Sequence, residues 1–501
     1  MTDAAVSRAA AAGASSRAGV RAGGLGIAAA LLVVAVLLRA VALDRQSLWL
    51  DELLALWIGQ QELGVLLERT RGVTGQSPLY YLFIRAWSDV FGRDSDLVVR
   101  ALSVVLGALS LAQIYAFARR FLDTERATLT LALLALSPAH LYFSQEARMY
   151  PLLMVLFLAF THLVLSAVRD PGARGLPRMA AIALLSAATM YTHYYAALFI
   201  LAVDFFLLVS WPASRPVLPR LVLAQAAGAV LYVPWIPALL HAAGSGGNPF
   251  IRFVGLKGVY TAFVFSLGYS AVVLDADHKD EILQVFRAHA PLVAVAGIVF
   301  GFLTLRGLLW LWRRERQLFA LVASILFLPV AISTVVSVKF PIISERYFTP
   351  ALPFFGLVLA CGLMDLKRSW RALAAAAVLA LFAFSLGRYY FDDRFGHHDW
   401  KRATAWLEER RTPGETVLLH PAFIAYGFDH YRRGDAPTRG IDDAAAVAEL
   451  RSDEGYFLFV THPRPALDGI VSALDARFQR VDELWLPRGE GIRVLRYAPR
   501  R

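Results

Sequence analysis

Two adjacent acids, Asp51 and Glu52, are the residues of this chain best placed to do chemistry. They directly follow the first long apolar segment, at the end of the run 47–52. Carboxylates are costly inside hydrocarbon, so we expect the pair just outside a membrane, facing water or an amphipathic substrate. An isolated pair of acids is more often an ordinary solvated pair, so the other polar clusters must decide between the two interpretations.

A second cluster, residues 144–150, lies between two apolar segments that are joined by almost no loop. It contains Glu146 and, two residues later, Arg148. At this spacing the carboxylate can contact a nucleophile or a metal ion while the guanidinium binds a phosphate. An exposed pair of this kind, taken alone, would contribute under about 1 kcal/mol and would mean little.

A third cluster, residues 345–350, stands at the start of another apolar segment. Its Arg346 and Tyr347 follow an acid, as Arg148 does in the second cluster. Arginine suits recognition of a phosphate through two parallel hydrogen bonds. The alternative is an arginine that only reaches from the apolar segment to the membrane interface.

Aromatic residues surround two further candidates. His193 stands among tyrosines in the run 191–195, where a lone histidine is more often part of an interfacial belt than a ligand. Tyr80 and Tyr81 end the run 76–81, which can shape a groove for a sugar or an isoprenoid chain. Packing against neighbouring helices is the commoner role for such aromatics, so they decide nothing alone.

The composition indicates which elements must position these residues. Of 501 residues, 57% are hydrophobic and 18% are charged, which predicts a polytopic membrane protein. A net charge of +11 is compatible with binding to nucleic acid. Much of the basic charge, however, flanks apolar segments, where membrane topology explains it. We therefore expect no nucleic-acid partner. The single cysteine, Cys361, excludes an internal disulfide framework and a cysteine zinc site.

Eleven apolar runs predict about eleven transmembrane helices, although the shortest are ambiguous at the roughly 20 residues that a span needs. Residues 1–23 predict a disordered cytoplasmic tail, and the first run lacks a persuasive cleavage site, so we expect it to be retained. The runs are 24–43, 97–118, 127–143, 150–168, 179–192, 195–211, 221–240, 291–311, 318–337, 350–366 and 372–390.

Short basic loops predict how the spans are oriented. Arginine and lysine gather in loops that all fall on one side of this topology, which the positive-inside rule makes cytoplasmic. The polar clusters then lie on the exoplasmic face of a multi-pass plasma (inner) membrane protein. The exoplasmic loop 44–96 carries amphipathic stretches typical of interfacial helices. Residues 259–274 are apolar but short, so a re-entrant segment and a span both stay open.

From residue 391 the composition changes to that of a small soluble α/β domain. We expect a helix at 399–411 and strands at 416–420, 456–461, 478–486 and 491–498. Residues 391–501 are therefore predicted to form an exoplasmic α/β domain of about 110 residues. It carries no glycine-rich phosphate motif after a strand, so nothing supports a nucleotide site there.

Taken in order, four of the motifs resemble family 39 glycosyltransferases of the GT-C class. They are 48–52, 77–81, 144–150 and 345–347, and the resemblance spans about residues 25–390. Relatives include protein O-mannosyltransferases and the bacterial enzymes that place aminoarabinose or galacturonate on lipid A. The resemblance implies a GT-C-like catalytic domain at 24–390, a polyprenyl-phosphate-linked sugar donor, and an exoplasmic lipid, glycan or protein acceptor.

The resemblance also implies roles for the residues. We expect Asp51 to be the base that takes the acceptor proton, and Glu52 and Glu146 to orient it, to position the acceptor or, with Asp51, to hold a divalent ion. The need for a metal stays open. Single displacement would invert the configuration at the anomeric carbon of the sugar. Arg148 and Arg346 would bind the donor phosphate.

One departure from the family affects the phosphate site. Some bacterial members carry a lysine just before the proline of the first loop, whereas this chain has Gln76 and Ser77, so other cations must serve. Weaker candidates for substrate contacts are Tyr80, Tyr81, His193 and Tyr347.

Two other functions compete with glycosyl transfer. A transporter or flippase of a lipid-linked or small anionic substrate would explain the many spans without catalysis. Transporters usually place coupling charges near the bilayer midplane and often show repeated halves, whereas the charges here gather at one face. A lipid-phosphate phosphatase or ligase is a further alternative. The sequence leaves the sugar, the acceptor and the oligomeric state undetermined.

Overall fold

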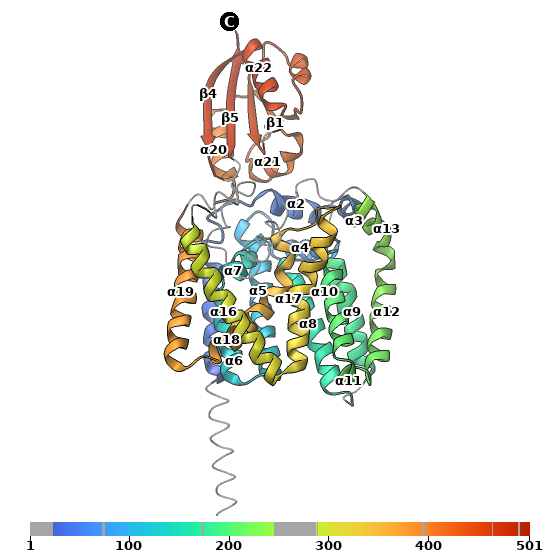
Figure 1. Cartoon of the computed structure of the whole chain (residues 1–501). Helices are drawn as coiled ribbons and strands as arrows, with labels where there is room; N and C mark the ends of the chain where they lie inside the picture. Colours follow the sequence, from blue (N-terminus) through green and yellow to red (C-terminus); the bar gives the residue numbers. More distant parts are fainter. Residues whose placement is uncertain are drawn as a thin grey trace, which may run out of the picture.

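The chain forms a bundle of helices with a small α/β domain at one end (Figure 1). The computed structural model describes residues 24–72, 76–172, 175–244, 287, 289–392, 396–462, 464–488 and 491–500. The predicted tail 1–23 and the undecided segment 259–274 therefore lie outside the described residues.

Each of the eleven apolar runs falls on a helix, but fewer of these helices qualify as spans than expected. Seven are long and apolar enough to cross a membrane, and an eighth candidate is a pair bent by 58°. The seven are α5 (Asp96–Phe121), α8 (Tyr150–Arg169), α12 (Leu218–Tyr232) continued by η1 (Val233–Trp235) and α13 (Ile236–Gly244), α16 (Ala290–Arg314), α17 (Arg316–Ser337), η3 (Glu345–Ala351) continued by α18 (Leu352–Met364), and α19 (Arg368–Phe391).

Helix length accounts for the difference in count. The described part of the first helix, Gly24–Ala40, has 17 residues, α9 (Leu176–Thr192) has 17 and α10 (Ala196–Val209) has 14, each short of the roughly 20 residues of a full span. The short α11 (Trp211–Ser214) follows α10. By length and composition, the part of the chain that the structure describes thus supplies seven or eight candidate spans rather than about eleven. The prediction of a mostly helical multi-pass membrane protein is confirmed.

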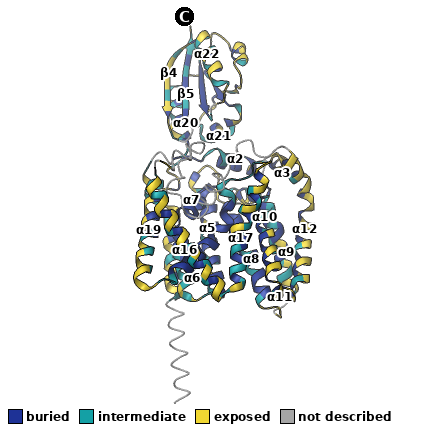
Figure 2. Ribbon diagram, viewed as in Figure 1, coloured by how far each residue is buried: buried dark blue, intermediate teal, exposed yellow. Residues whose placement is uncertain are grey.

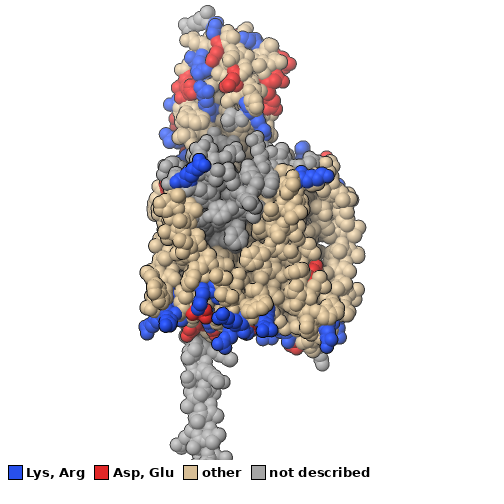
Figure 3. Space-filling model, in the orientation of Figure 1, with Lys and Arg blue, Asp and Glu red and all other residues tan. Residues whose placement is uncertain are grey.

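The surface of the bundle has the character of a lipid-facing protein. Its outer helix faces are exposed while its interior is buried (Figure 2). Large apolar side chains such as Leu223, Ile298 and Val335 are exposed there. Lysine and arginine gather along the rim opposite the α/β domain, with an almost uncharged belt above them (Figure 3). A wide uncharged belt bounded by a basic rim is the pattern of a protein embedded in a bilayer.

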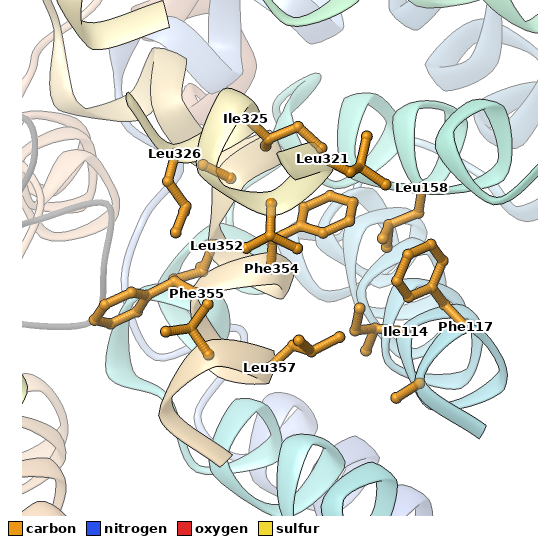
Figure 4. Packing of buried hydrophobic residues seen from close by; sticks show 14 of the residues in the cluster. Ile114, Phe117, Leu158, Leu321, Ile325, Leu326, Leu352, Phe354, Phe355 and Leu357 are labelled. Atoms are coloured by element: carbon orange, nitrogen blue, oxygen red, sulfur yellow. The ribbon is translucent and has the colours of Figure 1, made fainter. Parts of the chain in front are cut away.

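Aromatic and branched side chains fill the centre of the bundle (Figure 4). Phe354 of α18 meets Phe117 of α5 edge to face, with ring centroids 5.6 Å apart. Helices α16 and α18 approach so closely that a Cβ at Gly307 would lie 2.0 Å from the Val358 carbonyl oxygen. Because lipid is as apolar as the core, such close backbone packing at small residues holds membrane helices together.

The bent pair consists of α6 (Thr124–Ala135) and α7 (Pro138–Gln145). At the break the last carbonyl groups of α6 lack their regular i to i+4 partners, and buried Arg39 of the first helix donates to two of them, those of Ala135 (3.1 Å) and Leu134 (3.3 Å). Arg39 also contacts Nδ1 of His140 in α7 at 2.9 Å. This arginine therefore fixes the start of α7, the short helix that Glu146 follows.

Three short helices occupy the predicted exoplasmic loop 44–96, at the end of the bundle beneath the α/β domain (Figure 1). They are α2 (Leu50–Gly59), α3 (Leu63–Arg71) and α4 (Leu79–Phe91). The expected helices of this loop thus exist, and α2 carries the acidic pair in its first turn.

The α/β domain contains a five-stranded mixed sheet of order β2-β1-β3-β5-β4. Its helices are α20 (Trp400–Arg410), α21 (Ala425–Tyr431) and α22 (Leu467–Arg477), with η5 (Ala422–Ile424) and η6 (Ala445–Glu449). Its strands are β1 (Thr416–His420), β2 (Thr438–Gly440), β3 (Tyr456–Thr461), β4 (Phe478–Leu486) and β5 (Ile492–Pro499). β1 pairs in parallel with β2 and β3, while β5 is antiparallel to β3 and β4.

The predicted helix and four strands of this domain are present within two residues of their expected bounds. β3 is buried along its whole length, because α20 and α21 cover one face of the sheet and α22 the other. That is why its sequence is a continuous apolar run rather than an alternating one. The strand β2 was missed, since its three residues are polar and partly exposed.

Candidate functional site

The acidic pair stands at the N-terminus of α2, and its two members point in different directions. Successive residues of a helix are rotated by about 100°, so Asp51 and Glu52 cannot share partners. Glu52 closes a capping box in which its Oε2 accepts from the Trp49 N–H at 3.0 Å. Acids in a first turn also complement the helix dipole, which favours helix initiation at Leu50.

Glu52 is fully buried and both its oxygens are engaged. Arg100 of α5 donates from Nε to Oε1 (2.9 Å) and from Nη2 to Oε2 (2.6 Å), and the Ala147 N–H donates to Oε1 at 2.7 Å. A carboxylate with these partners joins α2, α5 and the 144–150 turn. This geometry favours the orienting role among those expected for Glu52.

Asp51 faces two arginines that come from distant parts of the chain. Its Oδ2 lies 3.0 Å from Nη1 of Arg346 and 3.6 Å from Nη2 of Arg148. Arg148 also donates from Nη1 to the Asp51 carbonyl oxygen at 2.8 Å. The Asp51 side chain remains 34% exposed, whereas Arg148 is almost fully buried. The structure therefore brings together three of the residues that were predicted to act together, with the carboxylate open to solvent.

Arg148 has donor capacity to spare. Its Nε is buried and has no hydrogen-bond partner among the described residues. A guanidinium offers five N–H donors in a rigid fork, and a buried donor left unpaired is costly. Arg148 therefore carries a buried donor that no described residue satisfies.

Glu146 lies at the end of α7, in the turn between the bent pair and α8, and is buried. Burial raises the pKa of its carboxyl from 4.5 to about 7, although Arg346 and a hydrogen bond with Tyr142 oppose that rise. A carboxyl that titrates near neutral pH can hold or give up a proton during a reaction. Tyr142 was missed by the sequence analysis, because α7 reads as part of an ordinary apolar run.

The raised pKa of Glu146 predicts a pH-dependent stability. The fold favours the protonated carboxyl, so stability is lost as pH rises from 4.5 toward 7, by roughly 2–4 kcal/mol in total. Glu146→Gln, which stays neutral, should lose less thermal stability than the wild type between pH 5 and pH 8. Melting temperatures of the purified proteins test this, and equal losses in both would assign the effect to other groups.

Aromatic side chains flank the arginines. The Tyr347 ring of η3 lies 4.7 Å from His193 and 5.1 Å from Tyr195. Burial, with Arg148 and Arg346 nearby, lowers the pKa of His193 to about 3, so this histidine is neutral. Its Nδ1 accepts from the Tyr195 N–H at 3.0 Å, which leaves the proton on Nε2.

Tyr80 and Tyr81 of α4 are both fully buried. Tyr80 lies next to Ser103 of α5, and neither tyrosine hydroxyl has a hydrogen-bond partner within the described ranges. The electrostatic neighbours of Tyr81 are Arg148 and Asp51, so its hydroxyl belongs to the same cluster. Of the paired tyrosines, Tyr81 is the better candidate for a substrate contact.

Besides Tyr142, two residues of the cluster were not predicted. Arg100 stands within an apolar run, and an ionisable residue in such a run is itself a signal of function that sequence reasoning could have used. Trp49 precedes the acids, and the Arg346 guanidinium lies over its ring at 5.1 Å from the centroid. A cation over an aromatic face is held in place electrostatically, so Trp49 helps to aim Arg346 at Asp51.

The described residues of the candidate site contain no preformed group of metal ligands. Nowhere in the described residues do three or more His, Cys, Asp or Glu side chains gather so that they could hold a metal ion. Positive charge near Asp51 comes instead from Arg148 and Arg346.

Comparison with known proteins identifies the fold and a family profile that matches part of the chain. Residues 75–240 match the profile of the family described as dolichyl-phosphate-mannose-protein mannosyltransferase. No curated protein sequence matches the chain significantly. The apo structure of ArnT from Cupriavidus metallidurans is similar with a TM-score of 0.60 and 14% identity, over 95% of this chain and 98% of that one.

Two further structures are similar at lower scores. ArnT from Cupriavidus metallidurans bound to undecaprenyl phosphate gives a TM-score of 0.52 and 14% identity, over 94% of this chain and 98% of that one. The Archaeoglobus fulgidus oligosaccharyltransferase in complex with Zn and sulfate gives 0.51 and 13% identity, over 94% and 73%. Over residues 75–240 the chain therefore resembles the dolichyl-phosphate-mannose-protein mannosyltransferase family, and over nearly its whole length it has the fold of ArnT.

Proposed function

We propose that this chain transfers a sugar from a polyprenyl-phosphate donor to a hydroxyl group of an acceptor at the exoplasmic membrane face. The observation that carries the proposal is the Asp51 carboxylate, open to solvent and flanked by Arg148 and Arg346. The family profile and the ArnT structure bound to undecaprenyl phosphate support the donor class.

The reaction is a single displacement. The acceptor oxygen attacks the anomeric carbon while Asp51 takes the hydroxyl proton, which makes a poor nucleophile reactive. The bond between the anomeric carbon and the phosphate oxygen breaks, and polyprenyl phosphate leaves with the electron pair. Attack from the face opposite the leaving group inverts the configuration of the sugar.

The arginines stabilise the leaving group. Charge develops on the phosphate as the bond breaks, and fixed cations in a largely buried site stabilise it without reorganising. The unpaired Nε of Arg148 is a donor available to this phosphate. As the phosphate binds, the guanidinium groups share their N–H donors between it and Asp51, which releases the carboxylate for the acceptor hydroxyl. No separate acid is needed, because phosphate is already a good leaving group.

The remaining residues orient the reactants. Glu52, held by Arg100, fixes the direction in which Asp51 points. Glu146 lies within the electrostatic reach of Arg346 and positions the acceptor. Tyr81, neutral His193 and Tyr347 line the cluster and offer hydroxyl, imidazole and ring surfaces to the sugar.

We propose that the site faces away from the cytoplasm, because the basic rim lies at the opposite end of the bundle (Figure 3). The only cysteine, Cys361, is buried, so labelling of an introduced cysteine by a thiol reagent is measured without background labelling of Cys361. A membrane-impermeant thiol reagent should label Ser452→Cys from outside intact cells, and should label Glu125→Cys, at the basic rim, only after the membrane is opened. The opposite pattern would invert the topology.

Transfer itself is tested with purified protein, a polyprenyl-phosphate sugar and candidate acceptors. Mass spectrometry of the cell envelope with and without the gene identifies the acceptor, because one glycan should be missing from cells that lack the gene. We expect Asp51-dependent product with an inverted anomeric linkage, measured by NMR. If the donor crosses vesicle membranes but is never cleaved, the transporter alternative replaces this proposal.

A further inference from the structure

The non-helical segment 43–49 leads directly into the catalytic helix α2 and is held from two sides. On the inner side Arg100 donates to three backbone carbonyls, those of Leu43 (2.8 Å), Gln46 (2.8 Å) and Ser47 (3.0 Å). Arg100 also binds Glu52, so one guanidinium fixes both the segment and the first turn of α2.

On its outer side the same segment is held by the C-terminal α/β domain. The ammonium of Lys401 in α20 donates to the Asp44 carbonyl at 2.9 Å, and the Lys401 N–H donates to Oγ of Ser47 at 3.2 Å. The Leu48 N–H donates to the hydroxyl of Tyr431, at the end of α21, at 2.6 Å. These contacts satisfy backbone groups that no secondary structure pairs.

Asp96 joins the two sides. It is the first residue of α5, one turn before Arg100, and is almost fully buried. Its carboxylate accepts from the Tyr431 hydroxyl (2.8 Å), lies 2.8 Å from the Lys401 ammonium and lies 3.4 Å from Nε2 of His430. The residues of the C-terminal domain that hold segment 43–49 are thus themselves fixed by the helix that carries Arg100.

A second route reaches the site through aromatic rings. His397, just before α20, stacks on Trp49 with ring centroids 5.5 Å apart and an interplanar angle of 11°. The other neighbour of Trp49 is the Arg346 guanidinium, which pairs with Asp51. One residue of the C-terminal domain is therefore separated from the catalytic carboxylate by only two side chains.

We propose that the C-terminal domain is a positioning device for transfer, in which Lys401 and Tyr431 are positioning residues that hold Asp51 against Arg148 and Arg346. The inference rests on the proposed function of Asp51. A displacement of about 1 Å at a reacting group can lower a rate by about 100-fold. Because segment 43–49 lacks helical or strand pairing, its position depends on the contacts that these residues supply.

Tyr431→Phe removes the hydroxyl that joins Leu48 to Asp96 and keeps the ring. We expect kcat to fall about tenfold with the donor KM unchanged, because the donor phosphate contacts remain. Tyr456→Phe is the matched control, since the Tyr456 hydroxyl bonds only to Arg451 and Glu454 within the C-terminal domain. Lys401→Met should resemble Tyr431→Phe, and Lys401→Arg, which keeps the cation, should recover most of the lost turnover.

Hydrogen exchange of residues 44–58, measured by mass spectrometry on the full chain, reports how firmly this segment is held. The measurement does not depend on sugar transfer. Faster exchange in Tyr431→Phe but not in Tyr456→Phe, together with the fall in kcat, supports the proposal. Wild-type exchange or wild-type kcat in Tyr431→Phe overturns it. If the wild type transfers no sugar, the proposed function fails, and exchange alone then decides whether the domain holds the segment.

Discussion

Asp51→Asn should lower sugar transfer at least about 100-fold, the scale expected when a positioned general base is lost. Asparagine keeps the size of the side chain and can still accept hydrogen bonds from Arg346 and Arg148, but it cannot take the acceptor proton. Initial rates of purified protein at saturating donor and acceptor measure the effect, and the amount of folded protein should be unchanged.

Glu62→Gln is the matched control for Asp51→Asn. It neutralises another acid of the same loop, at the N-cap of α3, where the side chain is exposed. We expect its turnover to stay near that of the wild type. Near-normal turnover in Asp51→Asn would instead eliminate Asp51 as the base and leave Glu146 as the next candidate.

Arg346→Ala and Arg148→Ala should each weaken donor use by roughly 1.5–3 kcal/mol, the range for hydrogen bonds to charged groups. This corresponds to about a 10- to 150-fold loss in kcat/KM for the donor. Both guanidiniums lie beside Asp51, the proposed base, so we expect them to contact the leaving phosphate. The KM of the acceptor should change much less.

Kinetics in which donor and acceptor are varied separately test both arginines. Arg439→Ala serves as the control, because Arg439 pairs with Glu449 on the surface of the C-terminal domain. A defect confined to the acceptor in both site variants would show that these arginines do not bind the donor phosphate. Arg346→Lys keeps the charge but loses the planar fork, so it should recover only part of the donor effect.

The sequence located most of the candidate site because charge cannot be placed freely in a membrane protein. The acids and arginines of 48–52, 144–150 and 345–347 had to lie at the ends of apolar segments, where they reach water. Their convergence around Asp51 follows from helices that return to the same face. The C-terminal strands were equally predictable, since β1 and β3 are short apolar runs bounded by polar turns.

The number of spans could not be predicted, because periodicity and composition do not report a break within an apolar run. The bend between α6 and α7 depends on Arg39, which satisfies carbonyl groups of a helix about 95 residues away. Likewise, α9 and α10 are too short to qualify as full spans, and only their packing in the bundle keeps them in the membrane domain.

By itself, then, the sequence determined a polytopic helical protein, an α/β domain after residue 391, and the residues that gather at one membrane face. The tertiary structure decided which partners each acid has. Arg100 pairs with Glu52, whereas Arg346 and Arg148 pair with Asp51. Those partners lie on α5, η3 and the 144–150 turn, and no local pattern encodes a contact across 295 residues. Burial and partner geometry, which set the role of a carboxylate, arise only when these segments pack together.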